Sequence, residues 1–580
     1  MKHISFAVLL AACVDRPSTT DAPIVPDGSP QPVSQCGNRE PLKRVLFGDL
    51  HVHTSHSLDS FGFANRNDPV AAYAFARGAL ALPIASGSDG AVTVAKLDPP
   101  LDFAAITDHS EFLSLMALCG YGTATSPAQC AALADQGSTR QTSLLASSLA
   151  RLAAPNPEPL RICQDDPASC ALAERTAWDR VQEAAQLADD PCTFSSLIGY
   201  EWTATTGGAN LHRNVIFGSD SVPEVAHDYL SFPTALALWQ ALEADCREAD
   251  GCAALTIPHN SNFSRGRMWD TADDPVSRDY MKRYQKLAEI YQHKGASECL
   301  AGTAFGDASC DFESLPNATD APGFLRDALA RGLTLARQTG SNPLALGIIG
   351  STDTHNGAPG SVGESQWAGH GAQQDDTAAE RLDNAPYFSP GGLAAVWAED
   401  NTRASIFAAL DRRETYATSG PRIVVRAYAL AGIPNNQAAA AYCSDPTFPA
   451  KLVEDGAIPM GGTVGGATAP YVFVSAMADR TALESFDIVR IHAASDQPAQ
   501  HVEVVALAGG EQQTFCRFWR DPDFVPGAPA LYYARVFEQP TARWTARDCR
   551  AEPTNPGCAD PTIPQQLRER AWTSPIFVVP

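Results

Sequence analysis

Two histidines stand two residues apart at the end of a short apolar run. His51 and His53 follow residues 45–50, and residues i and i+2 of an extended chain project from the same face. Both imidazoles could therefore bind one metal ion, although an HxH pair alone is weak evidence. Further potential ligands crowd the same loop, namely Asp49, His56 and Asp59.

Several later apolar runs also end in a potential metal ligand. They cover residues 103–109, 196–201, 253–259, 288–293 and 346–353, and they end at His109, Glu201, His259, His293 and Asp353. Turn residues 205–208 predict a hairpin that brings His212 back toward Glu201, and His355 follows Asp353 closely. A single histidine at a strand end is more often structural than a ligand. The whole set of nitrogen and oxygen donors suits zinc, manganese or iron.

The runs that carry these residues have the character of strands buried on both faces, since they are short and largely apolar. Ala- and Leu-rich segments at residues 171–188, 234–249 and 323–339 are predicted helices. Alternating strands and helices predict a parallel sheet, open or closed into a barrel, where polar groups at the carboxyl ends of strands meet on one face. Residues 110–192 and 263–286 are expected to be insertions over that face.

The chain changes character after residue 420. Strand-like segments at residues 423–428, 470–475, 502–506 and 531–536 are separated by Gly and Pro clusters. These patterns predict an α/β metallohydrolase domain over residues 36–420 and a C-terminal, mostly β, sandwich-like domain over residues 421–580.

The N-terminal segment resembles a bacterial lipoprotein signal. Lys2 precedes a short apolar stretch, and Leu10-Ala11-Ala12-Cys13 matches a lipobox, which implies cleavage before Cys13 and lipid attachment to its thiol. A plain signal peptide that contains a Cys is the alternative. Residues 14–35 are predicted to be a flexible tether. The protein is expected in the periplasm, anchored to the outer membrane.

The chain has fifteen cysteines, and fourteen remain when Cys13 is set aside as the predicted site of lipid attachment. An even number behind an export signal predicts a disulfide framework in an oxidising compartment, with free buried thiols as the alternative. Five pairs lie close together in sequence: Cys119/Cys130, Cys163/Cys170, Cys246/Cys252, Cys299/Cys310 and Cys549/Cys558. Cys36, Cys192, Cys443 and Cys516 remain for longer links whose connectivity the sequence leaves open.

The charge composition of the chain bears on the class of molecule that it could bind. The 580 residues include 42 Lys and Arg against 66 Asp and Glu, a formal net charge of −24. This balance argues against a nucleic-acid partner, which needs clustered cations. The 44% hydrophobic content is ordinary for a globular protein, and no apolar run is long enough for a spanning helix.

The ordered set of motifs resembles the PHP superfamily, the polymerase and histidinol phosphatase group. The residues that carry this resemblance are Gly48-Asp49-Leu50-His51-Val52-His53-Thr54, Ile106-Thr107-Asp108-His109 and Asp353-Thr354-His355. They are similar to a long, exported branch whose members were labelled only as a domain of unknown function. The resemblance covers about residues 42–421 and implies a distorted seven-stranded β/α barrel of PHP type with helical insertions.

The resemblance also implies two to three divalent metal ions. His51, His53, Glu201 and Asp353 would hold the first, and Glu201 would bridge to a second held by His212 and His259. Asp59, His109 and His355 would hold a third. Asp59 stands where many relatives have His, so His56 is a rival ligand there. His293 has no firm counterpart and is expected either to touch substrate or to be structural.

A metal centre of this kind predicts hydrolysis of a small anionic phosphoric ester by a hydroxide that bridges two metals. Glu201, Asp353, His293 and Arg267 are the expected catalytic residues, and a broad substrate range is expected. The expected substrate contacts are Arg265, Arg267, Lys294, Trp269 and Asn260, with Trp202 as a further aromatic surface for an aryl group.

Three alternatives stay open. The same metals would stabilise hydrolysis of aryl sulfates or phosphonate monoesters. An amide or lactone hydrolase shares the HxH and the late Asp. A non-catalytic surface lipoprotein could keep metals for stability alone, although structural zinc sites are usually single and closed.

Overall fold

The computed structural model describes residues 36–37, 42–86, 92–120, 130, 145, 147–148, 150–155, 157–316, 318–509 and 512–580. One compact unit spans Ser34–Pro580. The predicted signal segment, the lipobox Cys13 and the tether lie outside the described residues. No helix among the described residues is long and apolar enough to cross a membrane.

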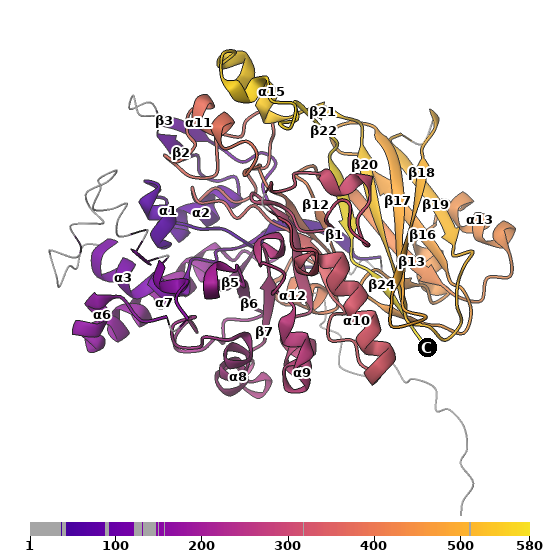
Figure 1. Cartoon of the computed structure of the whole chain (residues 1–580), viewed down its shortest axis with the longest axis horizontal. Helices are drawn as coiled ribbons and strands as arrows, with labels where there is room; N and C mark the ends of the chain where they lie inside the picture. Colours follow the sequence, from indigo (N-terminus) through magenta and orange to yellow (C-terminus); the bar gives the residue numbers. More distant parts are fainter. Residues whose placement is uncertain are drawn as a thin grey trace, which may run out of the picture. The chain divides into compact units, whose positions relative to one another are not determined.

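The protein is a mixed α/β structure built on a large mixed sheet (Figure 1). At its centre β1 (Arg44–Asp49), β4 (Phe103–Ala105) and β5 (Ser195–Trp202) run parallel. β6 (Arg213–Phe217) and β7 (Ala254–Pro258) continue from β5 as antiparallel strands, so the predicted hairpin after Glu201 is present. On the other side β11 (Leu393–Ala398) and β12 (Thr415–Thr418) are antiparallel. The predicted parallel pairing is present among β1, β4 and β5, whereas the sheet as a whole is mixed.

A second, smaller sheet carries two more of the predicted ligand strands. β8 (Leu287–Gln292) pairs in parallel with β10 (Gly347–Gly350) and antiparallel with the short β9 (Gly295–Ala296). β7 contacts β8, and β10 contacts both β11 and β12. Strands of both sheets share one buried apolar cluster that includes Leu46, Phe103, Leu197, Ile257, Leu287, Ile349 and Val396. The two sheets are therefore packed around a common core.

Helices occupy the connections between these strands. α7 (Pro167–Ala188), α8 (Ala235–Asp245) and α10 (Leu325–Thr339) lie where the composition predicted helices, and α9 (Pro275–Tyr284) and α12 (Arg403–Asp411) join them (Figure 1). α7 begins because Asp166 caps the backbone N–H of Ser169 and Pro167 occupies the first turn. Its small buried residues recur every three or four positions, which lets it pack closely against β5.

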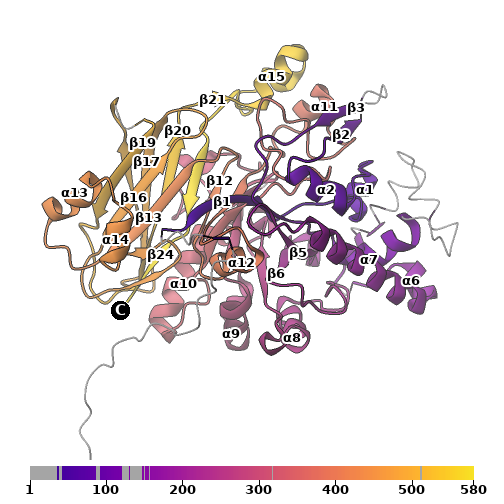
Figure 2. The ribbon, with the colours of Figure 1, turned by 180° about the vertical axis from the view of Figure 1, so that it is seen from behind.

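The C-terminal region is rich in β-structure, as predicted (Figure 2). One sheet contains β13 (Val424–Leu430), β14 (Ile458–Pro459), β16 (Tyr471–Met477) and β19 (Thr514–Arg520). The other strands are β15 (Thr463–Gly465), β17 (Leu483–His492), β18 (Ala499–Ala506), β20 (Ala530–Glu538), β23 (Arg570–Thr573) and β24 (Ile576–Val579). β23 pairs with both β20 and β12. These strands therefore extend the large sheet of the α/β region.

Seven disulfides join the cysteines that follow Cys13. All five predicted short-range pairs are present, and the longer links are Cys36–Cys192 and Cys443–Cys516. The predicted disulfide framework is confirmed. Such a framework favours an oxidising compartment.

Candidate metal centre

The ends of six strands meet at one place and bring all nine predicted ligands together. The loop after β1 lies beside the loop after β10, since the His53 N–H donates to the Thr354 carbonyl at 2.9 Å and the Asp353 N–H to the His51 carbonyl at 2.9 Å. A β-bridge joins His109 to Glu201. The donor atoms fall into several groups of three or four that could each hold a metal ion.

The first group contains the four residues predicted for the first metal. Nε2 of His51 and Nε2 of His53 each lie 3.2 Å from both Glu201 Oε2 and Asp353 Oδ1. The two Nε2 atoms are 3.3 Å apart. Ligands held about 2.0–2.1 Å from a tetrahedral zinc ion are separated by about 3.3–3.4 Å. The spacing therefore fits a single small cation among these atoms.

Neighbouring residues turn these two rings toward the group. His51 Nδ1 lies 3.1 Å from Glu289 Oε2. His53 Nδ1 lies 2.8 Å from Ser57 Oγ, which itself donates to Asp108 Oδ1 at 2.8 Å, so Ser57 accepts the His53 proton. Each ring thus uses Nδ1 for a supporting hydrogen bond and presents Nε2 to the carboxylates, as in the supported imidazoles of metal sites.

A buried oxygen without a donor marks the same place. Asp353 Oδ1 has no hydrogen-bond partner, whereas Oδ2 accepts from Gln292 Nε2 at 2.9 Å and from Lys294 Nζ. Burial would raise the pKa of Asp353, but the charges of His51 and Lys294 hold this pKa well below its usual range. The nearest donor atoms to this buried oxygen are Nε2 of His51 and His53 at 3.2 Å, and these three atoms are ligand types that divalent metals accept.

Burial and neighbouring charges also shift the pKa values of the imidazoles in the centre. Burial would lower the pKa of His51, but the charges of Asp353 and Glu289 outweigh burial and raise this pKa to about 10. Protons on such rings therefore compete with metal for the centre. Burial, assisted by the charge of His51, lowers the pKa of His259 to about 3, so this ring is neutral and ready to bind a metal.

The second group shares Glu201 with the first. Glu201 Oε1 lies 2.8 Å from His212 Nδ1 and 3.5 Å from His259 Nε2. His212 Nε2 in turn lies 3.0 Å from Thr205 Oγ1, a hydroxyl that donates to the Thr203 carbonyl. The two oxygens of Glu201 therefore face two different groups of imidazoles, as a bridging carboxylate must.

The third group is centred on Asp59. Its Oδ2 lies 3.1 Å from Nε2 of both His109 and His355. Thr203 Oγ1 lies 2.6 Å from His109 Nδ1, and the Asp353 carbonyl lies 2.9 Å from His355 Nδ1. The rival ligand His56 instead lines a separate cavity with Arg66 and Arg180. Asp59 thus joins the predicted third set.

His293 lies at the edge of the centre. Its Nε2 is 3.1 Å from Asp353 Oδ2, and it forms a possible metal-binding group with Asp353 and His355. Its ring stacks on His370, with 4.2 Å between ring centroids, and His370 Nδ1 lies 2.7 Å from Asp375 Oδ2. Neither His370 nor Asp375 was predicted from the sequence, because neither stands at the end of an apolar run.

The predicted substrate contacts divide into two sets. Lys294 contacts Asp353, and the buried Asn260, directly after His259, has a side-chain oxygen without a partner. Arg265 and Arg267 are exposed and donate to the Gly207 carbonyl at 2.9 Å and the Thr206 carbonyl at 3.1 Å. These two guanidinium groups therefore hold the turn between β5 and β6.

The two tryptophans expected to stack on substrate are not available for that contact in this structure. Trp269 and Trp202 are each 1% exposed and belong to the main hydrophobic core. The indole of Trp269 donates to the Gly323 carbonyl at 2.8 Å, and that of Trp202 donates to the Phe232 carbonyl at 2.9 Å. Both rings stabilise the loops that carry the ligands, and Trp202 in addition forms part of the wall of a cavity of about 500 Å³ that Arg267 also lines.

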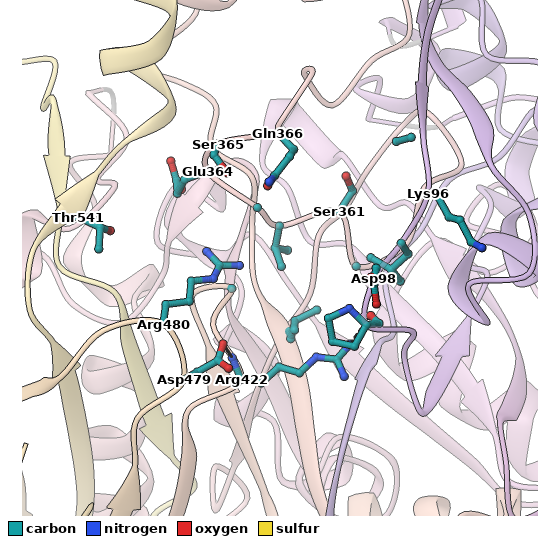
Figure 3. A pocket seen from close by; sticks show the side chains of 18 of the residues that line it. Lys96, Asp98, Ser361, Glu364, Ser365, Gln366, Arg422, Asp479, Arg480 and Thr541 are labelled. Atoms are coloured by element: carbon teal, nitrogen blue, oxygen red, sulfur yellow. Dashed lines mark hydrogen bonds between the residues drawn. The ribbon is translucent and has the colours of Figure 1, made fainter. Parts of the chain in front are cut away.

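A cavity of about 700 Å³ lies apart from this centre (Figure 3). Its walls combine Lys96, Asp98, Arg422 and Arg480 with the loop of residues 360–366, which follows His355 along the chain. None of the nine predicted ligands lines it. Arg422 already donates to the carbonyls of Pro99 and Pro100 at 2.9 and 2.7 Å.

Fold and site together define a class: a mixed α/β protein with a buried histidine–carboxylate centre suited to divalent metal ions. The chain belongs to the family described as "Protein of unknown function (DUF3604)", whose model matches residues 40–515 and 508–580. No curated protein and no solved structure matches the chain.

Proposed function

We propose that this protein is a metal-dependent hydrolase of phosphoric esters, both monoesters and diesters. The single observation that carries this proposal is the placement of Glu201, whose Oε2 faces His51 and His53 while its Oε1 faces His212 and His259. Two cations held on one carboxylate are the usual basis of metal-assisted ester hydrolysis.

Together with this function we propose a barrel fold for the α/β region. Contacts between β7 and β8 and between β10 and β12, together with the shared apolar core, support a distorted β/α barrel of PHP type. The seven disulfides support export. We accordingly place the protein in the periplasm, with attachment to the outer membrane through Cys13.

Bound divalent ions would supply Lewis acidity and would lower the pKa of water toward neutrality. The described ligand set would hold two or three such ions through His51, His53, Asp59, His109, Glu201, His212, His259, Asp353 and His355. The neutral rings of His259 and His355, whose pKa values burial lowers to about 3 and about 4, offer free lone pairs at neutral pH.

The chain's own residues define where a substrate would approach. The side chains of Glu201 and His53 are 1% exposed, whereas those of Asp59, His212 and Lys294 are 26%, 15% and 31% exposed. An ester would therefore enter over these three side chains. Lys294 would bind a non-bridging phosphoryl oxygen as a point charge. His293 lies beside Asp353, and burial together with the charge of Lys294 holds its pKa well below the ordinary value, so this ring would accept a proton near the substrate.

The test measures metal content and ester hydrolysis on the same preparation. The chain lacking residues 1–13 is purified, its metals are quantified, and aryl phosphate, phosphodiester, phosphonate and sulfate substrates are assayed with an amide and a lactone. We expect two or three metals per chain and turnover of phosphoric esters. Glu201→Gln should reduce kcat/KM by more than the about 100-fold expected for losing a supporting residue.

The matched control is Glu243→Gln, an exposed glutamate of α8 whose side chain bonds Tyr280 and Arg283 and none of the nine ligands. It should retain metal content and activity. Dominant sulfate turnover would keep the centre and change the substrate class. A fully metal-loaded protein that cleaves none of the esters, or an active Glu201→Gln variant, would contradict the proposal.

A further inference from the structure

A second polar cavity, of about 210 Å³, lies next to the metal centre. It is enclosed by η1 (Ser110–Phe112), the start of α7 and the segment around residue 230, and the Cys163–Cys170 disulfide forms part of its wall. Its polar lining consists of three carboxylates and three hydroxyls: Glu111, Glu174, Asp228, Ser110, Ser114 and Ser231. No lysine, arginine or histidine is among the described residues that line it.

Glu111 directs an unpaired oxygen into this cavity. Its Oε1 accepts hydrogen bonds from the backbone N–H groups of Thr203 at 2.8 Å and Tyr229 at 2.9 Å. Its Oε2 is buried and has no hydrogen-bond partner, although the residue is only 6% exposed. A buried carboxylate oxygen of this kind lacks the compensation that a native interior normally gives it.

The other two carboxylates add charge at the same place. Asp228 is held by the backbone N–H of Ser231 at 2.9 Å and by its hydroxyl at 3.0 Å, so its carboxylate has a fixed position. Its charge acts on both Glu111 and Glu174, since it raises the pKa of each of them in addition to the effect of burial. Three acids thus line one small cavity, and the described residues of its wall include no basic side chain.

We propose that this cavity is a binding site for a hard divalent cation of the calcium type. Carboxylate and hydroxyl oxygens are the ligands that calcium prefers, and six to eight of them, including water, complete its coordination. The lining provides oxygens only, in contrast to the imidazole-rich centre nearby, which suits zinc, manganese or iron. The two sites would therefore select different metals.

The ion would support the metal centre through Thr203. The Thr203 N–H donates to Glu111, while its hydroxyl lies 2.6 Å from His109 Nδ1 and 3.2 Å from Glu201 Oε1. A cation bound to Glu111 would therefore hold Thr203 in place beside the two ligands His109 and Glu201. The proposal concerns a separate site, so it does not depend on ester hydrolysis.

The test titrates calcium chloride into the full zinc-loaded chain lacking residues 1–13 and follows both heat and thermal unfolding, with magnesium chloride for comparison. We expect saturable calcium binding and a Tm that rises with calcium concentration. Glu111→Gln keeps an oxygen for Thr203 and Tyr229 but removes the charge, and it should weaken calcium binding about tenfold or more.

Glu174→Gln is the second variant, because this half-buried residue at the cavity should tolerate the change even if Glu111→Gln fails to fold. It should also weaken calcium binding. Glu224→Gln is the matched control, since its exposed carboxylate pairs with Arg175 at 3.0 Å outside the cavity. Absence of calcium binding at millimolar concentration, or equal binding by wild type and both cavity variants, would overturn the proposal.

Discussion

Charges are buried in two regions of this molecule, and their pairing differs. Where α10 meets β20, Glu298 and Asp307 lie among Arg326 and Arg535, and every carboxylate oxygen accepts at least one hydrogen bond. At the metal centre Asp353 Oδ1 accepts no hydrogen bond, and Nε2 of His51 and of His53 lie 3.2 Å from it. Burial of charge therefore does not by itself indicate a site, and the spacing of these candidate ligands is what distinguishes the centre.

The pKa values follow the same division. Burial would raise the pKa values of Glu298 and Asp307, but the two arginines lower each of them to about 2. This pairing needs no further ion. At the centre, by contrast, the pKa of His51 rises to about 10 because the negative charges of nearby carboxylates stabilise the protonated ring. In the first region every carboxylate oxygen is paired within the protein, whereas under our proposal metal ions from solution would complete the second.

Removing one cation from the complete region should have the largest effect. Arg535→Met leaves Asp487 without its buried arginine and leaves Asp307 and Glu298 with Arg326 alone, because Arg535 Nη2 lies 2.6 Å from Asp487 and 3.0 Å from Asp307. The free energy of unfolding should fall by about 3–5 kcal/mol, measured by denaturant titration with disulfides intact.

Arg161→Met is the control for that change. Arg161 is 79% exposed and pairs with Asp165 at 3.6 Å, so its loss should alter stability by no more than about 0.5 kcal/mol. Equal stability losses in the two variants would show that the buried network is no better paired than the surface, and the comparison would fail.

A smaller effect is expected when a supporting group of the centre is neutralised. Glu289→Gln keeps an acceptor for His51 Nδ1 but removes the charge that orients and polarises the ring. Metal affinity should fall about 10–100-fold, measured by competition with a chelator, while the unfolding free energy of the metal-free protein changes little. Unchanged affinity would mean that Glu289 belongs with the paired network and not with the centre.

The smallest effect on stability is expected from a third group of buried charges, the neighbouring carboxyl groups of Glu569 and Glu364. Burial and the charge of Glu364 raise the pKa of Glu569 to about 8, from an ordinary value of 4.5. The folded state therefore holds this proton more firmly than the unfolded state. The resulting stability is fully present below pH 4.5 and is lost as the pH rises toward 8.

Glu569→Gln should remove that dependence. Between pH 6 and pH 7 the wild-type free energy of unfolding should fall, relative to the variant, by on the order of 1 kcal/mol. Parallel pH profiles of the two proteins, measured by denaturant titration, would place Glu569 among ordinary surface carboxylates.

The sequence predicted the ligands better than their supports. Most of the nine candidate ligands stand directly after apolar runs, where a short motif has direct structural meaning, while Asp59 and His212 lie in the adjoining loops. Glu289 lies inside such a run and is adjacent to His51 only through the fold, and Ser57 and Thr203 are common residues in no special spacing. Supports of this kind depend on pairings between distant strands, for which a single sequence has no local signal.

The absence of a local sequence signal also explains why the burial of the tryptophans and the pairing of the C-terminal strands were not predicted. Trp269 follows His259 in a loop, and its sequence context does not reveal that a neighbouring helix covers it. The C-terminal strands were recognised as strands, but the pairing of β23 with β12 joins residues far apart in the chain. Strand identity is a local property, while strand partnership is not.

The pairing of β23 with β12 has a consequence for biosynthesis. Trp572 in β23 donates to Glu298 at 2.7 Å, so the large sheet and its buried ion network both require residues 570–573. A ribosome or secretion channel that still holds those residues leaves β12 with an open edge. Completion of the large sheet must therefore wait until residues 570–573 have emerged, and chaperones that protect unpaired strand edges would act during that interval.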